Sequence, residues 1–241
     1  MKALILAAGL GTRLVPITNE RPKSLVSVNG KPILIKQIEN LYENGIVDIT
    51  IVSGYKAQIL KKTVHNKWPE IHVVESVNYA STNNMYSAYL GIKSMFPKGI
   101  IAPFLMMNAD VFFDASVISA LLADSSSNAI IVDIGRYIEE SMKVVEKDGR
   151  LVAISKKIVS EDALGTSIDV YKFSAKGGEA FYNHCVDYIE ERKELKLWSE
   201  VALNDALMDE IFQACPLKGR WCEIDDYDDL ATAEALFAED L

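Results

Sequence analysis

Short apolar runs alternate along the chain with longer segments in which apolar residues recur at helical spacing. Lys2–Ala7 is such a run, and it predicts a strand buried on both faces. From Ile33 onward apolar residues recur every three or four positions as far as Gly45, which predicts a helix ending at this glycine. A strand, a helix and another strand are predicted next, over 46–53, 56–68 and 71–75. This order is typical of βαβ units and a mostly parallel sheet.

The same order continues to about residue 127 and then changes. Asn83 or Asn84 is expected to cap the next helix. Further along, the turn residues Lys147–Arg150 separate two strand-like runs, which predicts a hairpin. The other predicted elements are strands over 104–108, 130–134, 167–173 and 221–224 and near residue 212, and helices over 115–124, 175–193, 199–209 and 226–238. Because the chain contains no internal repeat and no low-complexity linker, we expect one α/β domain.

Composition and charge exclude several classes of protein. The 241 residues are 49% hydrophobic and 24% charged, which is ordinary for a folded globular protein and excludes disordered and fibrous ones. A net charge of -9 argues against nucleic acid and against an anionic membrane surface as partners. No apolar run approaches the ~20 residues of a membrane span. The 3 cysteines show no Cys-x-x-Cys spacing, so we expect neither a disulfide framework nor a zinc site, and a cytoplasmic location.

The loop after the first predicted strand is rich in glycine. It contains Gly9 and Gly11, which allow backbone N–H groups to turn toward an anion, and a helix beginning beyond them would add its positive end. A dinucleotide-binding fingerprint would need a third glycine where Leu14 stands. A Walker loop is excluded because Gly30 and Lys31 are followed by proline. Taken alone, the glycines fit an anion-binding loop or a tight turn between a strand and a helix.

The residues that follow this loop carry a resemblance to a known family. Gly9-Leu-Gly-Thr-Arg13 is followed by Pro16 and then by Pro22-Lys23, a pattern similar to the signature of the nucleotidyltransferases that make NDP-sugars and CDP-linked small molecules. Further similar segments are Val28–Ile33, Val52–Tyr55, Met107–Asp110 and Glu223–Asp225. The chain length and Ser81–Ser87 most resemble the small cytidylyltransferases acting on choline phosphate or 2-aminoethylphosphonate.

The resemblance implies a fold and a division of the chain. It implies a Rossmann-like three-layer α/β/α fold of the nucleotide-diphospho-sugar transferase type, with a mixed, mostly parallel sheet and a small β-hairpin extension. A single nucleotidyltransferase domain would span residues 1–241. Residues 1–125 would mainly bind the nucleotide, and residues 126–241 would mainly bind the acceptor.

The implied reaction is the Mg²⁺-dependent transfer of a cytidylyl group from CTP to a small phosphorylated or phosphonylated acceptor, with release of pyrophosphate. The acceptor resembles phosphoglutamine, aminoethylphosphonate or choline phosphate, and the product would serve surface polysaccharide or phosphonate and phosphoramidate modification. A phosphate monoester is already an anion near neutral pH, since its second pKa is about 6, so no strong general base is needed. The sequence agrees, because it offers no Ser-His-Asp or Cys-His arrangement.

The resemblance assigns the chemistry to two cations near the beginning of the chain and to two carboxylates further along. The resemblance makes Arg13 and Lys23 the catalytic residues, with Arg13 on the triphosphate and Lys23 on the α-phosphate. Asp110 and Asp225 would hold Mg²⁺. Asp226 competes with Asp225 for this role unless it caps the last helix, and Asp114 is the expected cap of the helix near residue 115. Residues 1–36 carry a net charge of +5 and residues 221–241 one of -8, which suits this division.

Two further sets of residues are implied for the substrates. The nucleotide-binding set is Leu6, Ala7, Ala8, Gly9, Gly11, Thr12, Gly54, Asn84 and Ser87. The acceptor-binding set is Lys143, Lys156, Glu200 and Glu223, with Glu200 available to pair with a substrate amine. Choline is disfavoured, because Met142 and Lys143 stand where a tryptophan of an ammonium cage is expected and a lysine there would repel the ligand.

Two other functions stay open at this point. One is a sugar-1-phosphate nucleotidylyltransferase, which would share the first motif, although the chain is short for it. The other is a non-catalytic nucleotide-binding regulatory subunit. The expected partners are CTP and a small anionic acceptor, without nucleic acid or membrane, and apolar residues of the late hairpin could form a homodimer.

Overall fold

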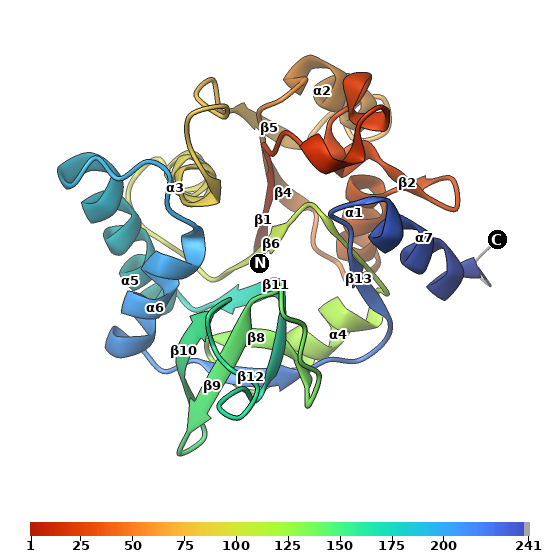
Figure 1. Ribbon diagram of the computed structural model, residues 1–241. Coiled ribbons are helices and arrows are strands. Elements are labelled where there is room, and N and C mark those ends of the chain that lie inside the picture. Colours follow the sequence, from red (N-terminus) through yellow and green to blue (C-terminus); the bar gives the residue numbers. More distant parts are fainter. Residues whose placement is uncertain (239–241) are drawn as a thin grey trace.

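The first strand lies in the middle of a mixed sheet. In the computed structural model, which describes residues 1–238, this sheet has nine strands (Figure 1). β1 (Lys2–Ala7) pairs in parallel with β4 (Asp48–Ser53) and with β6 (Phe104–Asn108), and β5 (His72–Glu75) continues the parallel part beside β4. The last 3 residues of the predicted domain 1–241, with the acidic Glu239 and Asp240, lie outside the described part.

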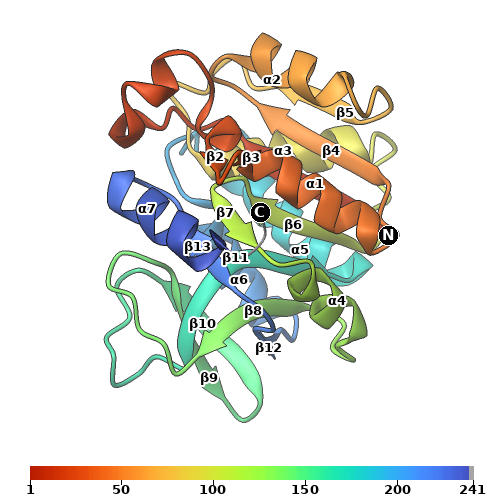
Figure 2. The ribbon, with the colours of Figure 1, turned by 90° about the vertical axis from the view of Figure 1, so that its right-hand side faces the viewer.

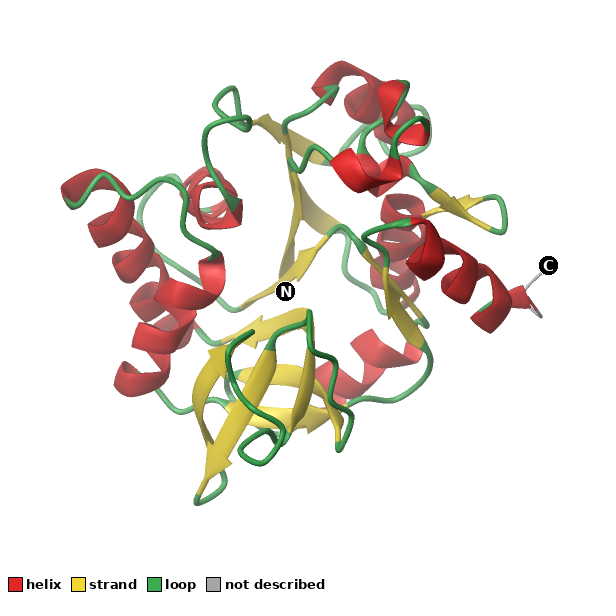
Figure 3. Ribbon diagram, in the orientation of Figure 1, coloured by secondary structure: helices red, strands yellow, loops and turns green. Residues whose placement is uncertain are grey.

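The later strands extend this sheet mostly in the antiparallel direction. β11 (Gly165–Phe173) pairs antiparallel with β6 and joins the two halves of the sheet. The strands beyond it are β8 (Ala129–Ile134), β9 (Lys143–Lys147), β10 (Arg150–Ser155) and β12 (Gln213–Pro216). β9 and β10 form the predicted hairpin, which projects from the rest of the sheet (Figure 3).

Helices cover both faces of the sheet, which gives three layers. One face carries α1 (Ile33–Glu43), α2 (Ala57–His65) and α4 (Ser116–Ala123). The other face carries α3 (Asn84–Met95), α5 (Ala175–Val186) and α6 (Ser199–Asp209). The side chains of β1 alternate between these two cores, since Ile5 packs on the first face and Leu4 on the second. The predicted mostly parallel α/β architecture is confirmed in its central strands.

A smaller layer brings the beginning and the end of the chain together (Figure 2). β7 (Val111–Phe113) pairs antiparallel with β13 (Trp221–Glu223), and α7 (Tyr227–Leu236) follows. Phe112 packs edge-on against Phe237 of this layer, with 4.8 Å between ring centroids. The short strands β2 (Ser27–Val28) and β3 (Lys31–Pro32) and the 3₁₀ helices Thr12–Leu14, Ile17–Asn19 and Lys23–Leu25 complete it.

Three local predictions are corrected by the structure. The glycine loop leads into the three-residue 3₁₀ helix Thr12–Leu14, so the helix expected directly beyond this loop is a single 3₁₀ turn. Asp114 does not cap α4, because its carboxylate accepts hydrogen bonds from Arg220 Nε at 3.0 Å and Nη2 at 2.9 Å. The helix predicted over 175–193 ends at Val186 and continues as a π-helical turn over Asp187–Glu191.

Candidate active site

A cavity of about 330 Å³ opens where the parallel strands end. Leu6 and Asn108 lie at the carboxyl ends of β1 and β6, and both line it. Open α/β sheets bind ligands at this edge, because the loops that leave neighbouring parallel strands meet there. The other lining residues are Ala8, Gly9, Arg13, Tyr79, Thr82, Asn83, Asn84, Ser87, Asp110, Met142, Lys156, Asp169, Trp198, Glu200, Glu223 and Asp225.

Three carboxylates from distant parts of the chain meet in this cavity. One oxygen each of Asp110, Glu223 and Asp225 lies within 4.8 Å of the others. Asp110 lies two residues after the end of β6 and directly before β7. The pairing of β7 with β13 brings the other two carboxylates to it, and the N–H group of Ile224 donates to the Asp110 carbonyl at 2.9 Å. Glu223 and Asp225 are two positions apart and face the same way, as side chains on an extended segment do.

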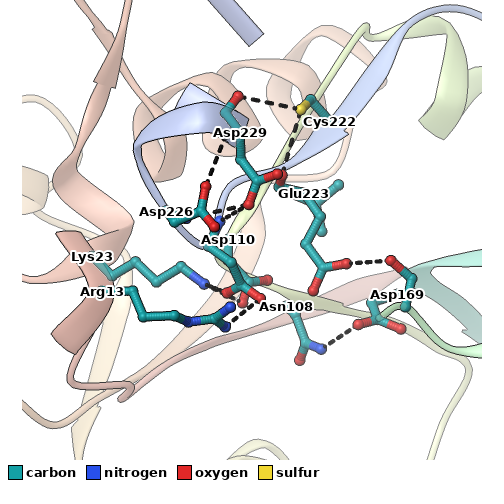
Figure 4. Close-up of polar contacts among 12 residues, drawn as sticks. Arg13, Lys23, Asn108, Asp110, Asp169, Cys222, Glu223, Asp226 and Asp229 are labelled. Carbon is teal, nitrogen blue, oxygen red and sulfur yellow. Dashed lines mark hydrogen bonds and ion pairs between the residues drawn. The ribbon is translucent and has the colours of Figure 1, made fainter. Parts of the chain in front are cut away.

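Two cations lie against these carboxylates (Figure 4). The Lys23 ammonium is 2.9 Å from Asp110 Oδ2 and 2.5 Å from Asp225 Oδ1, and Arg13 Nη2 is 2.6 Å from Asp225 Oδ2. Burial alone would lower the pKa of Lys23, but the two carboxylates outweigh it and hold this pKa above its ordinary value. Burial would likewise raise the pKa of Asp225, and Lys23 and Arg13 reverse the shift. Lys23 and Asp225 are therefore both charged at neutral pH.

Gly11 explains how Lys23 reaches the carboxylates. Its φ of +64° is the left-handed conformation that glycine adopts without strain. A Cβ built on Gly11 would lie 2.7 Å from the Cβ of Lys23, too close for any side chain. The glycine is thus required for the approach of the loop to Lys23, in addition to any contact with a phosphate.

Asp225 and Asp226 have separate roles in the structure. The Asp226 carboxylate accepts the N–H groups of Asp228 and Asp229 at 3.0 Å and caps α7, with Asp229 completing a capping box. Asp229 also accepts the N–H group of Asp225 at 2.9 Å. The cap therefore fixes the backbone of Asp225 and leaves its side chain free to face the cavity.

Glu223 has a raised pKa, whereas that of Asp225 is lowered. Burial, followed by the charges of Asp110 and Asp225, raises the pKa of Glu223 to about 7. The Ser141 hydroxyl donates to Glu223 Oε2 at 2.9 Å, and this hydrogen bond and the charge of Lys156 oppose the shift. Near neutral pH, Glu223 is thus partly protonated when neither metal nor substrate is bound.

A second group of acids lines the cavity beyond Glu223. Tyr171 places its hydroxyl 2.7 Å from Asp169 Oδ1 and 3.1 Å from Glu200 Oε1, and Asn108 Nδ2 donates to Asp169 Oδ2 at 2.9 Å. Asp169 has a φ of +57° at an irregularity between Ser167 and Tyr171, where the pairing of β11 with β8 shifts register. Such a bulge re-aims a side chain, and here it turns Asp169 toward the cavity.

The structure brings most of the predicted site residues together. Those that line the cavity are Leu6, Ala8, Gly9, Arg13, Asn84, Ser87, Asp110, Lys156, Glu200, Glu223 and Asp225. Lys23 reaches it through its two ion pairs. Ala7, Gly11, Thr12 and Gly54 do not line it. Gly54 supports it, since a Cβ there would lie 2.6 Å from Tyr79 Cβ and 2.7 Å from the Ala8 carbonyl.

Lys143 departs from its predicted place. We expected it to face the acceptor, but its side chain is buried and its ammonium donates to the carbonyls of Glu139 at 2.7 Å and of Lys156 at 2.6 Å. The strong donor capacity of the ammonium is used to join two loops, so Lys143 does not line the cavity. Its neighbour Met142 does.

Several lining residues were missing from the predicted site. These are Asn108, Asp169 and Trp198, with Tyr79 and Thr82. An aspartate inside the strand-like run 167–173 was a usable signal for Asp169, because a charge in a run predicted to be a strand of the sheet needs a reason to be there. Trp198 directly precedes α6 and Glu200, and only the packing of this helix brings it to the cavity.

Cations beside a carboxylate cluster at the carboxyl edge of a parallel sheet suit an enzyme that binds and transfers phosphate-bearing groups. The chain belongs to the Nucleotidyl transferase family, which matches residues 2–239. No helix in the described part of the chain is long and apolar enough to cross a membrane.

Curated relatives include several cytidylyltransferases. CTP:phosphoglutamine cytidylyltransferase of Campylobacter jejuni is 28% identical, and the match covers 95% of this chain and 98% of the relative. Choline-phosphate cytidylyltransferase of Streptococcus pneumoniae is 50% identical over 90 residues, a local match to 37% of this chain and 38% of that protein. A GlmU bifunctional protein of Methanococcus maripaludis is 30% identical over 98% of this chain, which spans 54% of that relative.

Solved structures agree with the fold. The CTP:phosphocholine cytidylyltransferase of Streptococcus pneumoniae superposes with a TM-score of 0.80 and 27% identity, over 98% of each chain. An inositol-1-phosphate CTP transferase of T. maritima has a TM-score of 0.79, with 99% of this chain and 95% of that chain covered. At 22% identity the latter supports the fold alone. The expected nucleotide-diphospho-sugar transferase fold is confirmed.

Proposed function

We propose that this enzyme transfers the cytidylyl group of CTP to a small phosphorylated or phosphonylated acceptor. The observation that carries the proposal is the meeting of Arg13 and Lys23 with the carboxylates of Asp110, Glu223 and Asp225 in one cavity. The curated cytidylyltransferases named above support cytidine as the nucleoside. In the reaction, an acceptor oxygen forms a bond to the α-phosphorus, and the bond to the oxygen bridging the α- and β-phosphates breaks. Pyrophosphate leaves with the electron pair.

The carboxylate cluster fits a magnesium ion. Mg²⁺ prefers one or two carboxylates with water and substrate phosphates as ligands. Asp110 Oδ1 is buried and has no hydrogen-bond partner among residues 1–238, as a ligand oxygen would be before its metal arrives. Asp110 and Asp225 would hold the ion, with Glu223 beside them. Bound Mg²⁺ supplies positive charge that neutralises the triphosphate.

The two cations have different tasks. Arg13 is the more exposed, with 61% of its side chain accessible, and its planar fork suits two phosphate oxygens of an entering triphosphate. Lys23 is 12% accessible and is held by Asp110 and Asp225, so it stays within the site as a point charge near the α-phosphate. Positioning and charge neutralisation then provide most of the acceleration, as in phosphoryl transfer generally.

The nucleotide base is assigned to the wall formed by β1 and α3. Asn84 Oδ1 accepts the N–H group of Ser199 at 2.8 Å, which fixes the amide and leaves its NH₂ group to donate. A cytosine edge offers O2 and N3 as acceptors for that group. Ser87 lies one helical turn further on, and Leu6 and Ala8 would pack against the ring.

Pyrophosphate release tests the function. The purified enzyme is given CTP, UTP, dTTP, ATP or GTP in turn, with and without Mg²⁺. The acceptors are ethanolamine phosphate, 2-aminoethylphosphonate, choline phosphate, phosphoglutamine, glycerol 3-phosphate and glucose 1-phosphate. We expect Mg²⁺-dependent release with CTP and a small acceptor, and none from the Asp110→Ala variant. Preference for UTP or dTTP with glucose 1-phosphate would favour the sugar nucleotidylyltransferase instead, and no release with any pair would reject both.

We also propose a cellular location and an oligomeric state. The 3 cysteines are free, two buried and one half-buried, which suits a reducing compartment such as the cytoplasm. The homodimer stays a prediction, and light scattering on the purified protein checks it.

A further inference from the structure

The aspartates proposed to hold a metal already bind cations of the protein itself. The Lys23 ammonium lies 2.9 Å from Asp110 Oδ2 and 2.5 Å from Asp225 Oδ1. Arg13 Nη2 lies 2.6 Å from Oδ2, the second oxygen of Asp225. Asp110 Oδ1 is the carboxylate oxygen of this pair that has no partner within residues 1–238. The two cations therefore engage every other oxygen of the proposed metal ligands.

An ammonium and a divalent cation compete for such oxygens. Mg²⁺ binds carboxylate oxygens at about 2.0–2.1 Å and demands near-octahedral geometry around itself. Lys23 Nζ contacts one oxygen of each aspartate, so it bridges Asp110 and Asp225 as an ion held by both would do. Its positive charge would also repel an arriving dication. Lys23 in this position is thus incompatible with a metal ion bound by both aspartates.

The side chain of Lys23 combines a packed base with a flexible end. Gly11 packs against the base, since a Cβ built on Gly11 would lie 2.7 Å from the Cβ of Lys23 and 3.3 Å from its Cγ. The bonds beyond Cγ rotate freely in a lysine, and the side chain extends toward Asp110 (Figure 4). Because both aspartates line the cavity, rotation of these bonds can carry the ammonium from the carboxylates to a phosphate bound there.

We propose that Lys23 is the counter-ion of the carboxylate cluster in the free enzyme, and that it leaves Asp110 and Asp225 for the phosphates of the nucleotide when a divalent cation takes its place. This rests on the proposed function and adds a control on metal entry. The phosphates supply the partner that a largely buried ammonium needs on leaving its carboxylates. Nucleotide and metal should consequently strengthen each other's binding by the same factor.

Metal affinity and turnover should then respond to Lys23 in opposite directions. Without nucleotide, only the molecules in which Lys23 has left the aspartates can bind the metal through both. The apparent Kd equals the intrinsic Kd divided by that fraction. Removing the ammonium makes every molecule competent, so Lys23→Met should bind metal more tightly than the wild type although its turnover is lower.

Manganese binding without nucleotide tests the inference. Electron paramagnetic resonance measures free Mn²⁺ and gives the Kd without any turnover. We expect Lys23→Met to lower this Kd at least about tenfold relative to the wild type. Lys156→Met is the matched control, because Lys156 lines the same cavity but its ammonium lies 5.3 Å from the centroid of the Trp198 ring. The control should change the Kd far less.

A second measurement uses the wild-type protein and does not depend on the folding of a variant. Crystals are soaked in Mn²⁺ alone, and at the same concentration in Mn²⁺ with a CTP analogue that has a methylene group between the α- and β-phosphates. Anomalous scattering locates the ion. We expect Lys23 on Asp110 and Asp225 in the first crystal. In the second we expect an ion on these aspartates and Lys23 against the phosphates.

The outcomes separate the inference from the function beneath it. Mn²⁺ binding to the free wild type as tight as to Lys23→Met overturns the inference. An equal gain in Lys156→Met also overturns it, because it would show a general effect of charge, and so does an ion on Asp110 and Asp225 with Lys23 still in place. These results leave the cytidylyltransferase intact, since they do not involve turnover. Absence of pyrophosphate with every nucleotide and acceptor rejects the proposed function itself.

Discussion

Lys23 Nζ lies 2.5 Å from Asp225 Oδ1, across 202 positions of the chain. The pair joins the basic loop near the beginning of the chain to the acidic strand end near its close. Because Asp225 is also a candidate metal ligand, the same carboxylate would hold the proposed catalytic cation and complete the proposed magnesium site. Variants of Lys23 and of Asp110 separate these two tasks.

Replacing Lys23 with alanine should lower kcat about 100-fold while CTP affinity changes far less, because the ammonium acts where charge develops in the transition state. Steady-state kinetics and calorimetric CTP binding measure the two effects. Lys2→Ala is the control, since Lys2 forms a 2.6 Å ion pair with Asp48 on the surface. A variant in which CTP binding alone suffers would contradict the role of Lys23.

Asp110→Ala should abolish Mg²⁺-dependent turnover while the protein remains folded by circular dichroism. The cluster loses a proposed metal ligand, whose Oδ1 atom has no hydrogen-bond partner among residues 1–238. Asp48→Ala, the other half of the surface pair, should retain activity. Wild-type turnover in the Asp110 variant would remove this residue from the metal site.

Glu223 should make the metal-free protein less stable as pH rises. Its pKa of about 7 in the folded state lies above the ordinary value of 4.5, so between these values the folded protein holds a proton that the unfolded chain has released. Stability contributed by this proton is full at low pH and is lost as pH rises through about 7. The groups that face Glu223 are Asp110, Asp225, Lys156 and the Ser141 hydroxyl.

Thermal unfolding in EDTA checks this dependence against Glu223→Gln. The melting temperature of the variant minus that of the wild type should increase from pH 5 to about pH 7 and then level off, since the wild type is fully ionised above that range. A difference that stays flat across this range would show that Glu223 titrates normally.

Lys143→Met should raise the KM for the acceptor several-fold and leave the KM for CTP unchanged. The ammonium ties the carbonyls of Glu139 and Lys156, so its loss frees the loop that carries Lys156. Two partly buried carbonyls also lose their charged donor, at about 1–3 kcal/mol in the free energy of unfolding. Lys143→Arg should restore part of both effects.

Lys172→Met provides the control for this variant. Lys172 is also buried, and its ammonium also donates to two carbonyls, of Leu121 at 3.0 Å and Asp124 at 2.8 Å, but it does not line the cavity. It should lose comparable stability with no change in the KM for the acceptor. Equal kinetic effects in both variants would reduce Lys143 to a purely structural residue.

Gly11→Ala should lower kcat by displacing Lys23, because the new Cβ would lie 2.7 Å from that of Lys23. Gly30→Ala shares the backbone strain of about 1 kcal/mol without the clash, since Gly30 has a φ of +82° and no atom within 4 Å of a Cβ. Chemical denaturation and steady-state kinetics compare the two. If both variants keep the wild-type kcat, the packing of Gly11 on Lys23 does not matter for catalysis.

Local pattern was sufficient for most of the elements. Lys2–Ala7 is a strand with the predicted bounds, because a strand buried on both faces is continuously apolar. β7 was missed because three residues directly after Asp110 resemble a loop until β13 pairs with them. Asp114 was assigned to a cap by its position, but Arg220, 106 positions away, offers its carboxylate stronger charge-assisted hydrogen bonds.

The site residues that belong to a family motif were predictable from the sequence. Those whose side chains are oriented by tertiary contacts were not. Arg13, Lys23, Asp110 and Asp225 follow family spacing, and the structure brings them together. Asp169 depends on a left-handed backbone that is uncommon outside glycine, and a charge within a strand-like run signals an exception without showing where the side chain points. Lys143 and Lys156 are 13 positions apart, and only the folded loops show which ammonium faces the cavity.

The register shift in β11 determines which side chains of this strand face the cavity. Side chains on a strand alternate, so sliding β11 by one residue would replace Asp169 in the cavity with its apolar neighbour Ile168 or Val170. This side of the cavity would change from acidic to apolar without any amino-acid substitution. A single insertion or deletion near the bulge could therefore change the acceptor while the glycine loop and the proposed metal ligands stay the same. A library of point mutants would not contain such a change.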